Sequence, residues 1–389
     1  MRLAFNATSL LSPLTGIGQY SRQLALGLKG RSDIDTSFFY GAAWTKEVRN
    51  EAMPGAATVL PWIRKHVPLS YSLRRFIQEQ RFAAGARGQQ FDVYHEPNIL
   101  PLPFDGPSVV TIHDLSWIRY PEMHPIERVR AMNKYFEPGL RRATVLLTDS
   151  EFVKDEVVKT FSIDPQRVQT IPLGVENLFQ PRLAQQIRPT LDHNGLTYGK
   201  YLLAVGTLEP RKNLSLALRA YARLPKHVRE HCPLVLVGMK GWLTSSLEKQ
   251  LAPMLRSGEV KQLGYLTREE LAYVISGATS LVYPSVYEGF GLPPLEAMAS
   301  GVPVIASNVS SIPEVVGDTG ILINPLDVDA TTDAMRLLID DSDLRNNLAS
   351  RALERSRNFT WARCIDRTIQ SYYRAIDARL MFNIDNTVN

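Results

Sequence analysis

The sequence predicts an α/β protein with two domains, because short apolar segments alternate with helix-like segments along almost the whole chain. At 389 residues the chain has the length of two domains of ordinary size. The alternation is interrupted over Asn177–Thr197, where Pro and Gly are scattered and periodicity is weak. The two series predict two Rossmann-like domains whose parallel sheets face a central cleft.

Apolar runs bounded by turn residues predict the strands. The first series places strands at Leu3–Ala7, Thr36–Tyr40, Thr58–Leu60, Phe91–Tyr94, Ser108–Ile112 and Thr144–Thr148. The second series places them at Tyr201–Val205, Leu234–Val237, Val260–Leu263, Ser280–Tyr283, Val302–Ile305 and Gly320–Ile323. We expect a helix from about Gly18 to Leu28 and a long one over Trp361–Leu380. The expected domains are 1–172 and 199–360, joined by 173–198 and followed by a terminal segment, 361–389.

Composition excludes several classes of protein. A content of 44% hydrophobic and 21% charged residues is typical of soluble globular proteins. No run of about 18 apolar residues is present to span a bilayer, and Met1–Thr8 is too short in apolar length for a signal peptide. The two cysteines, Cys232 and Cys364, are too few for a disulfide framework or a thiolate metal site. We expect a cytoplasmic protein.

Basic charge is concentrated in the first half of the chain. Residues 1–190 hold 23 Lys and Arg against 18 Asp and Glu, whereas the remainder holds 21 of each. Within Trp62–Arg87 six basic residues accompany Glu79 alone and are interleaved with aromatic and aliphatic residues. Such a segment predicts contact with an anionic membrane surface, and a solvated helix face is the alternative. No recognised motif for binding nucleic acid accompanies it.

The most specific motif is Glu-Gly-Phe-Gly-Leu-Pro-Pro-Leu-Glu over residues 288–296. Glu288 is expected on a glycine loop that leaves a strand, and Glu296 in the first turn of the following helix. Free backbone N–H groups at such a helix start suit an anion. Carboxylates accept hydrogen bonds from sugar hydroxyls, so the motif suits a phosphorylated sugar.

A pair of cations follows the first strand of the second series. Gly206-Thr-Leu-Glu-Pro-Arg-Lys-Asn places Arg211 and Lys212 just before a helix, with Asn213 as the expected N-cap. Two adjacent cations can neutralise a leaving diphosphate without a metal. Farther on, Thr267 and Glu270 predict a capping box after the stretch Gly264-Tyr-Leu.

Glycines and polar residues follow the strands of the first series. Gly16 and Gly18 lie between the first strand and the first helix and permit close approach to a ligand. A dinucleotide fingerprint with Asp33 or Asp35 as the ribose acid is the rival interpretation, but Ser21 occupies the position of the third glycine. The other candidates at the ends of strands are His113, the pair His95 and Glu96, and the pair Ser150 and Glu151.

The motif over residues 288–296 resembles the E-x7-E signature of retaining glycosyltransferases of family 4, which have the GT-B architecture. The resemblance implies two Rossmann-like domains with a C-terminal helix that crosses back onto the first. It implies that Glu296 holds the nucleotide ribose and that Glu288 lies beside the donor sugar. It places the rest of the donor site at Gly206, Arg211, Lys212, Gly289, Phe290, Gly291 and Leu292.

The other motifs have implied roles in the same family. Gly16 and Gly18 resemble its N-terminal glycine loop, and His113 matches a histidine near the donor sugar. Tyr265 and Leu266 correspond to the stretch that holds the nucleotide base, largely through backbone atoms. The candidates for contact with the acceptor follow strands and are expected to open toward the predicted cleft: His95 with Glu96, and Ser150 with Glu151.

The combination of Asn6-Ala-Thr, Thr15-Gly-Ile-Gly, His113-Asp and the 288–296 motif looks most like mannosyltransferases of O-antigen and surface-polysaccharide assembly. That resemblance implies GDP-mannose as donor and a lipid-diphosphate-linked glycan as acceptor, at the inner face of the cytoplasmic membrane. Donors carrying UDP, such as UDP-glucose or UDP-N-acetylglucosamine, stay open. An epimerase, a phosphorylase and a non-catalytic binder of sugar nucleotides are further alternatives.

Three Asp-x-Asp pairs match the pattern by which another class of glycosyltransferase binds metal. They begin at Asp33, Asp327 and Asp341, and chance matches are expected among 39 acidic residues. Because Arg211 and Lys212 can supply the charge that Mg²⁺ would provide, we expect an enzyme that needs neither a metal nor a cofactor.

Overall fold

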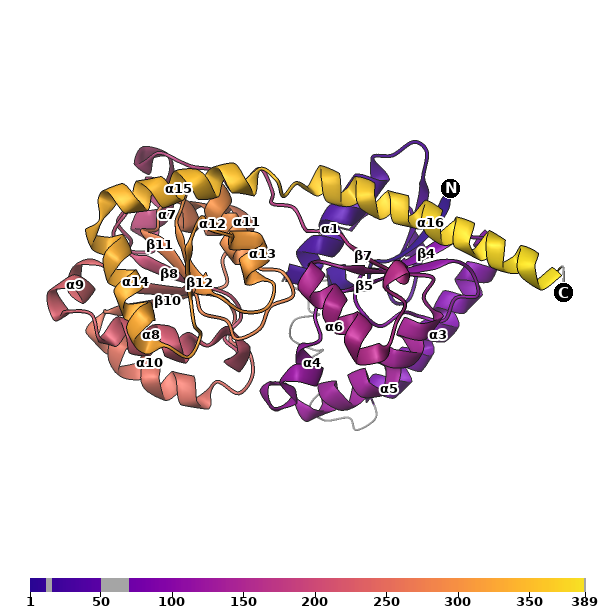
Figure 1. Cartoon of the computed structure of the whole chain (residues 1–389), viewed down its shortest axis with the longest axis horizontal. Coiled ribbons are helices and arrows are strands. Elements are labelled where there is room, and N and C mark those ends of the chain that lie inside the picture. Colours follow the sequence, from indigo (N-terminus) through magenta and orange to yellow (C-terminus); the bar gives the residue numbers. More distant parts are fainter. Residues whose placement is uncertain (12–15, 50–69, 388–389) are drawn as a thin grey trace. The chain divides into compact units, whose positions relative to one another are not determined.

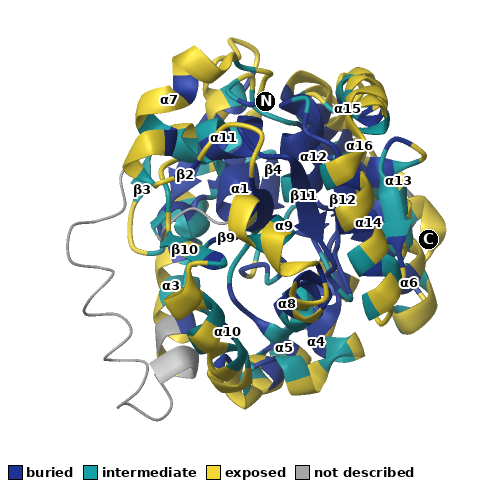
Figure 2. Ribbon diagram, turned by 90° about the vertical axis from the view of Figure 1, so that its left-hand side faces the viewer, coloured by how far each residue is buried: buried dark blue, intermediate teal, exposed yellow. Residues whose placement is uncertain are grey.

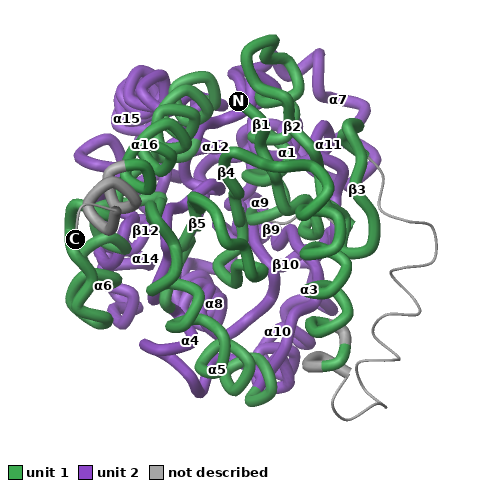
Figure 3. The backbone as a smooth tube through the Cα atoms, turned by 90° about the vertical axis from the view of Figure 1, so that its right-hand side faces the viewer, with its two compact units in different colours: residues 1–115, 126–173, 361–389 green, residues 116–125, 174–360 purple. Residues whose placement is uncertain are grey.

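The structure, a computed structural model, describes residues 1–11, 16–49 and 70–387. The predicted strand at Thr58–Leu60 and the first part of the basic segment, 62–69, lie outside these residues. The chain forms two compact units (Figure 3). Unit 1 comprises residues 1–115, 126–173 and 361–389, and unit 2 comprises residues 116–125 and 174–360. In each unit helices cover the faces of a sheet (Figure 1).

The sheet of unit 1 has the order β3-β2-β1-β4-β5-β6-β7. Its paired strands are parallel except that β3 runs antiparallel to β2. The strands are β1 (Arg2–Asn6), β2 (Asp35–Phe39), β3 (Trp44–Thr45), β4 (Val93–Glu96), β5 (Ser108–Ile112), β6 (Val145–Thr148) and β7 (Val168–Thr170). The α-helices of this unit are α1 (Gly16–Lys29), α3 (Ser70–Gln89), α5 (Ile126–Arg142), α6 (Glu151–Phe161) and α16 (Trp361–Thr387).

The sheet of unit 2 has the order β10-β9-β8-β11-β12-β13 and is parallel throughout. Its strands are β8 (Leu202–Val205), β9 (Leu234–Val237), β10 (Val260–Gly264), β11 (Ser280–Tyr283), β12 (Val304–Ser307) and β13 (Ile321–Ile323). The α-helices are α4 (Ser116–Arg119), α7 (Ala184–His193), α8 (Leu214–Ala222), α9 (Lys226–His231), α10 (Ser245–Ser257), α11 (Arg268–Ser276), α12 (Leu292–Ala299), α13 (Ile312–Val316), α14 (Val328–Asp340) and α15 (Ser342–Ser356).

The predicted fold class is confirmed, since both sheets have the doubly wound strand order. The return of the terminal helix to the first domain is also confirmed, because α16 belongs to unit 1. There the Tyr372 hydroxyl lies 2.7 Å from Nδ1 of His95 in β4. The described strands that were predicted agree with the structure to within about two residues at each end.

Three elements were not predicted. Strands β3 and β7 have only two and three residues, too few to show an alternating pattern. Helix α7 lies inside Asn177–Thr197, which was expected to be irregular because Pro and Gly are scattered there and periodicity is weak. Buried Ile187 and Leu191 hold α7 against α11, so tertiary packing outweighs the weak local pattern.

The inner strands of both sheets are buried along their length, as Figure 2 shows for β11 and β12. The same holds for β4, β5, β6 and β9. Strands of a parallel sheet lie between two layers of helices, so apolar side chains are needed on both faces. In β9 all four residues are aliphatic and buried. This explains why the strands read as continuous apolar runs rather than as alternating patterns.

The strand order determines where a ligand can bind. Connections leave the sheet in opposite directions on either side of β1 and β4 in unit 1, and of β8 and β11 in unit 2. At such a switch point a crevice opens outside the carboxyl ends of the strands. In unit 2 the loops at this point carry Arg211, Lys212 and Glu288.

Glycines join the carboxyl ends of β8, β9 and β10. The amide of Gly206 donates to Val237 O at 2.9 Å, and the amide of Gly238 donates to Gly264 O at 2.8 Å. Gly238 has φ +149°, and a Cβ atom there would lie 1.9 Å from the carbonyl oxygen of Gly206. Since that atom belongs to the backbone, no rotation of a side chain can relieve the clash.

We expect Gly238→Ala to lower the free energy of unfolding by about 3 kcal/mol or more, because strain and overpacking act together. Gly258→Ala is the matched control. Gly258 also has positive φ, +78°, but no atom lies within 4 Å of its added Cβ. Backbone strain alone should cost about 1 kcal/mol there. Urea denaturation of both variants tests the difference, and equal losses would contradict this account of the glycine contact.

Candidate active site

Arg211 and Lys212 lie on a 3₁₀ turn, Pro210–Lys212, between β8 and α8. The next residue, Asn213, has a left-handed backbone conformation, with φ 52°. Asn213 occupies the N-cap position of α8, as predicted, but its side chain makes no capping hydrogen bond. Its Nδ2 instead donates to Pro284 O at 3.2 Å and to Pro325 O at 2.7 Å. Asn213 therefore connects the turn to the loops that follow β11 and β13.

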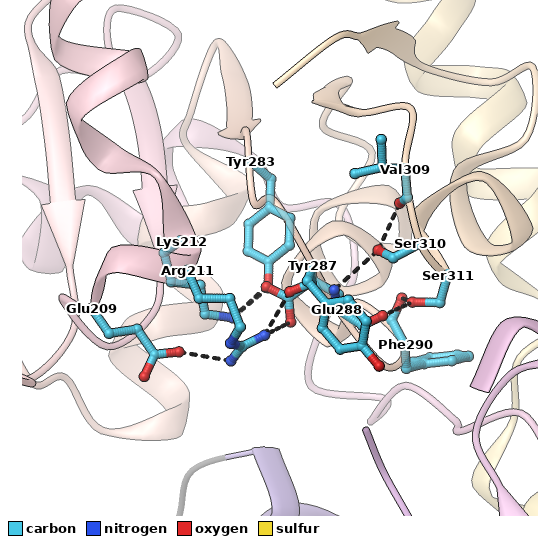
Figure 4. A network of polar contacts seen from close by, with 10 residues as sticks. All are labelled: Glu209, Arg211, Lys212, Tyr283, Tyr287, Glu288, Phe290, Val309, Ser310 and Ser311. Carbon is cyan, nitrogen blue, oxygen red and sulfur yellow. Dashed lines mark hydrogen bonds and ion pairs between the residues drawn. The ribbon is translucent and has the colours of Figure 1, made fainter. Parts of the chain in front are cut away.

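Glu288 is shared between the two cations (Figure 4). Its Oε2 accepts from Arg211 Nη1 at 2.8 Å, and its Oε1 accepts from Lys212 Nζ at 2.7 Å. Lys212 also donates to the Tyr283 hydroxyl at 2.7 Å, and Arg211 Nη2 donates to Glu209 at 2.7 Å. Each of these charged side chains is at most 14% exposed, so solvent screens their attraction weakly.

The charges of this cluster oppose the effect of burial. Burial alone would raise the pKa of Glu288, but Arg211 and Lys212 outweigh it and lower the pKa to about 2. For Lys212, burial is the larger effect and lowers the pKa of the ammonium group. Glu288 is thus a carboxylate across the physiological range, and a weak base.

The loop after Glu288 is fixed by two serines that precede α13. Ser310 Oγ accepts from the amide of Glu288 at 3.0 Å, and Ser311 Oγ donates to the carbonyls of Glu288 and Phe290, each at 2.9 Å. Gly291 has φ +121° and immediately precedes α12. The loop amides therefore hold fixed positions before a ligand arrives.

The start of α12 offers fewer amides than the motif suggested. Leu292 is followed by Pro293 and Pro294, which have no N–H group. Among the first three helical residues, only Leu292 has an amide for an anion. Glu296 lies in the second turn of α12, not in the first turn as predicted, and accepts from Arg268 Nη2 at 2.9 Å.

The stretch expected to hold the nucleotide base lies between β10 and α11. The predicted capping box is present: Glu270 Oε2 accepts from the amide of Thr267 at 2.9 Å, and Thr267 Oγ1 accepts from the amide of Glu270 at 3.3 Å. Tyr265 is half exposed and Leu266 is partly buried. Both residues lie at the carboxyl edge of the sheet, directly after β10.

In unit 1, His113 follows β5 and is buried. Its Nδ1 lies 2.7 Å from Asp149 Oδ2, and its Nε2 lies 2.8 Å from Pro97 O. Pro97 O can only accept, so Nε2 carries a proton, and Nδ1 shares a proton with Asp149. Burial lowers the pKa of His113, but the charge of Asp149 and these hydrogen bonds outweigh it and raise the pKa. Both ring nitrogens are thus engaged, and neither is free to act as a base.

His95 is wholly buried between β1, β5 and α16. Its Nδ1 is bonded to Tyr372, and its Nε2 lies 2.9 Å from Thr111 Oγ1. Burial lowers the pKa of His95 to about 3, so its ring is neutral. The predicted contact of His95 with an acceptor does not fit this arrangement, in which both nitrogens serve the core of unit 1.

Glu96, at the end of β4, is buried and accepts hydrogen bonds from three donors. It accepts from Asn6 Nδ2 at 2.6 Å, from the Tyr94 hydroxyl at 2.7 Å and from the amide of Asn98 at 3.1 Å. Burial raises the pKa of Glu96 to about 7, although these hydrogen bonds act in the opposite direction. Among the unit 1 candidates, Glu96 is the buried acid that titrates near neutral pH.

The remaining candidates of unit 1 lie at helix starts. Ser150 is buried and caps α6, accepting from the amide of Val153 at 3.2 Å, so its hydroxyl is already used. Glu151 is the first residue of α6 and is exposed. Gly16 and Gly18 lie in the first turn of α1, which begins two residues earlier than predicted.

Within the described part of the chain, no group of three or more His, Cys, Asp or Glu residues could hold a metal ion. Two of the Asp-x-Asp pairs have a local role. Asp327 caps α14 and Asp341 caps α15, each accepting from backbone amides. Asp33 forms an ion pair with Arg31 at 3.1 Å.

Comparison with known proteins assigns the chain to a family. Residues 14–177 match the family model described as Glycosyltransferase Family 4, and residues 193–355 match the one described as Glycosyl transferases group 1. An O-antigen chain mannosyltransferase B of Escherichia coli is 37% identical over 380 residues, covering 96% of this chain and 99% of that protein. The chain belongs to glycosyltransferase family 4.

Two further proteins support the assignment. An MMP alpha-(1->4)-mannosyltransferase of Mycolicibacterium hassiacum is 32% identical, covering 79% of this chain and 75% of its own length. A sucrose-phosphate synthase of Thermosynechococcus elongatus has the same fold, with a TM-score of 0.75 at 22% identity, over 97% of this chain and 100% of that one. The GT-B fold of family 4 is thereby confirmed.

Several residues of the candidate site were not found from the sequence. Glu209 and Tyr283 hold Arg211 and Lys212, and Asp149 holds His113. Asp149 follows directly after a predicted strand, so its position was a usable signal. Arg268 had no such signal, because its partner Glu296 is 28 residues away on another helix.

We expect the contribution of Glu288 to stability to disappear in acid. Because its pKa is lowered from 4.5 to about 2, the unfolded chain binds a proton at a higher pH than the folded protein does. The stabilisation is complete above about pH 5 and is lost as the pH falls towards 2, with an upper limit of about 3 kcal/mol. Glu288→Gln removes this dependence, so the stability difference from wild type should shrink below pH 5.

Urea denaturation at pH 7, 5, 4 and 3 measures that difference. Glu230→Gln is the control, since Glu230 is exposed and 3.6 Å from Lys226. It should follow the wild-type profile at every pH. Parallel profiles for wild type and Glu288→Gln would show that Glu288 is not held as a carboxylate by the cluster.

Proposed function

We propose that this family 4 enzyme transfers mannose from GDP-mannose to a hydroxyl of a lipid-diphosphate-linked glycan, with retention at the anomeric carbon and without a metal. The proposed setting is O-antigen or surface-polysaccharide assembly at the inner face of the cytoplasmic membrane. The observation that carries the proposal is the buried pair Arg211 and Lys212 beside Glu288. Similarity to mannosyltransferases over nearly the whole chain supports the choice of sugar.

Arg211 and Lys212 would stabilise the leaving diphosphate. Negative charge grows on the phosphate oxygens as the glycosidic bond breaks, and preorganised cations in a poorly screened site lower that barrier. Glu209, Tyr283 and Glu288 fix both cations before the donor arrives. The amides of Gly289, Phe290, Gly291 and Leu292, with Gly206, are the proposed backbone donors to the same phosphates or to the sugar.

Glu288 would bind the sugar rather than remove a proton. A general base works best when its pKa lies near the working pH, and the pKa of Glu288 is about 2. Its carboxylate is also engaged by two cations, which weakens it as a nucleophile. Both facts favour a hydrogen-bond acceptor for hydroxyl groups.

The proposed chemical step is attack on the same face as the leaving group. The bond between the anomeric carbon and the phosphate oxygen breaks, and a bond from the acceptor oxygen to that carbon forms. The acceptor proton passes to the leaving phosphate, so the products are a glycoside and GDP. No protein carboxylate takes part in covalent bonding, which agrees with the state of Glu288.

Other residues have proposed binding roles. Glu296 would hold the ribose, and the backbone of Tyr265 and Leu266 would hold the base. In unit 1, Glu96 and Glu151 are the candidates for the acceptor, and His113 would lie near the donor sugar.

We expect GDP-mannose to raise the melting temperature of the wild-type protein in EDTA more than UDP-glucose, UDP-N-acetylglucosamine or ADP-glucose does. A ligand present at 100 times its Kd stabilises by about 2.7 kcal/mol. Arg211→Ala/Lys212→Ala should lose the shift, and Lys212→Gln alone should reduce it. Arg188→Ala/Lys226→Ala, which removes two exposed cations, should keep it.

If only UDP sugars raise the melting temperature, the proposed donor is wrong but the proposed diphosphate site stands. If no donor raises it, the proposed function is rejected. NMR of the product tests retention directly, because the anomeric coupling distinguishes the two configurations. Turnover of GDP-mannose without an acceptor would favour an epimerase.

The proposed membrane contact rests on helices α3 and α5 of unit 1. Leu73, Phe76 and Ile77 are exposed at helical spacing on α3, with exposed fractions of 61%, 56% and 42%. Arg75 of α3 lies over the ring of Tyr135 in α5 at 4.8 Å, so the two helices pack together. Exposed cations on the two helices include Arg81, Arg128, Arg130 and Lys134. No helix in the described ranges is long and apolar enough to cross a bilayer.

We expect the protein to sediment with vesicles that contain phosphatidylglycerol, and less with pure phosphatidylcholine, since basic residues are attracted to anionic lipid by about 1 kcal/mol each. Leu73→Ser/Phe76→Ser/Ile77→Ser should weaken binding at least about tenfold, because three apolar groups no longer enter the interface. Leu326→Ser, at an 80% exposed position of unit 2, is the control. Unchanged binding of the triple variant would exclude this surface.

A further inference from the structure

Arg268 is the first residue of α11, directly after the stretch proposed to hold the nucleotide base. Its guanidinium group joins two carboxylates from other parts of unit 2. Nη2 donates to Glu296 of α12 at 2.9 Å, while Nη2 and Nε donate to one oxygen of Glu176 at 2.5 and 3.0 Å. A single side chain thus connects α11, α12 and the segment before α7.

The guanidinium group is held in one position. Its Cζ lies 4.6 Å from the ring centre of Phe179, so the flat face of the cation rests on an aromatic side chain. The side chain of Arg268 is only 25% exposed, and the carboxylates of Glu176 and Glu296 are 16% and 5% exposed. Three contacts in different directions leave little rotational freedom.

Glu296 is anchored through only one of its two oxygens. Oε1 accepts from Arg268, whereas the described residues include no partner for Oε2. Burial raises the pKa of Glu296, and the nearby guanidinium acts in the opposite direction. Without that cation, a carboxyl group at this depth would retain its proton more readily and would accept hydrogen bonds less well.

The second carboxylate sets the charge of the group. Glu176 and Glu296 together carry two negative charges against one positive charge on Arg268. The group keeps a net negative charge, which suits hydroxyl donors and disfavours phosphate. Hydrogen bonds to a charged acceptor are about twice as strong as neutral ones.

We propose that Arg268 is a positioning residue for the nucleotide: it fixes Glu296 as an oriented carboxylate that binds the 2′- and 3′-hydroxyls of the donor's ribose. This inference rests on the proposed function, in which Glu296 holds the ribose. Arg268 itself touches neither the sugar nor the phosphates. Because it follows Thr267 directly, it also fixes the distance between the base stretch and the ribose carboxylate.

The test measures preference for ribose rather than activity. Isothermal titration calorimetry gives Kd for GDP and for 2′,3′-dideoxy-GDP, which lacks both hydroxyls, with UDP and its dideoxy analogue as a second pair. Wild type should prefer GDP by at least about tenfold, as expected for hydrogen bonds to a charged acceptor. Arg268→Gln should bind GDP more weakly, so that the preference falls below about threefold, with the Kd of the dideoxy compound unchanged.

Conservative and control variants sharpen the comparison. Arg268→Lys keeps the charge but loses the forked geometry, so it should restore part of the preference. Glu176→Gln should change the preference less than Arg268→Gln does, since Glu296 keeps its cation. Arg188→Gln removes an exposed arginine of the same unit and should leave both constants unchanged. Thermal melting of each variant reports whether it is folded.

The outcomes separate the two proposals. If wild type prefers ribose and Arg268→Gln keeps that preference, or weakens both ligands equally, Arg268 does not act through Glu296 and the inference is overturned. If Arg268→Gln does not fold, Arg268→Lys decides. A preference for GDP over dideoxy-GDP equal to that of wild type overturns the inference, and a smaller preference supports it. If titration of wild type with GDP or UDP gives no heat beyond the buffer control, neither nucleotide binds. The proposed function is then rejected, and the inference with it. If only UDP and its dideoxy analogue bind, the ratio of their Kd values in wild type and in each variant tests the inference about Arg268 in the same way.

Discussion

The ion pairing of Glu288 with Arg211 and Lys212 is the interaction on which the second unit depends. Three charges meet where solvent access is low, and each is tolerable only because the others are present. They meet because β8 and β11 are neighbours in the sheet. In the sequence, 74 residues lie between the end of β8 at Val205 and the start of β11 at Ser280. The doubly wound strand order creates that adjacency, so the charge cluster is a consequence of topology. In turn the cluster ties the loops after these two strands together, through Asn213 and Tyr283 as well as through the charges.

Most of this fold could be predicted from the sequence because parallel strands buried on both faces leave uninterrupted apolar runs. Ser108–Ile112, Leu234–Val237 and Ser280–Tyr283 were predicted with the same ends as in the structure. The elements that could not be predicted are stabilised by neighbours rather than by their own sequence. Helix α7 contains a proline and is held by two buried residues against α11, and β3 is a two-residue addition to the sheet edge. Local pattern contains no information about such partners.

The site divides in the same way. Arg211, Lys212 and Glu288 were recognisable because each belongs to a contiguous motif between a strand and a helix. Their pKa shifts could not be predicted from the sequence, because a pKa depends on burial and on charges from other segments. His95 and His113 illustrate this, because both were predicted from their positions at strand ends. Burial lowers the pKa of His95, whereas the charge of Asp149 outweighs burial and raises the pKa of His113. Arg268 was overlooked since Glu176, one of its partners, is 92 residues away.

The position of α16 has a consequence for how the polypeptide matures on the ribosome. Unit 1 contains the first residues of the chain and also its last helix, and Tyr372 of that helix is wholly buried against His95. The amino-terminal unit therefore cannot complete its interior until α16 has been synthesised. Most of unit 2 is a continuous segment, 174–360, that is synthesised earlier than α16. Amino-terminal domains usually finish folding first, whereas here unit 1 lacks α16 until after residues 174–360 of unit 2 have been synthesised. Until α16 emerges, β4, β5 and β6 lack one of the elements that pack against them.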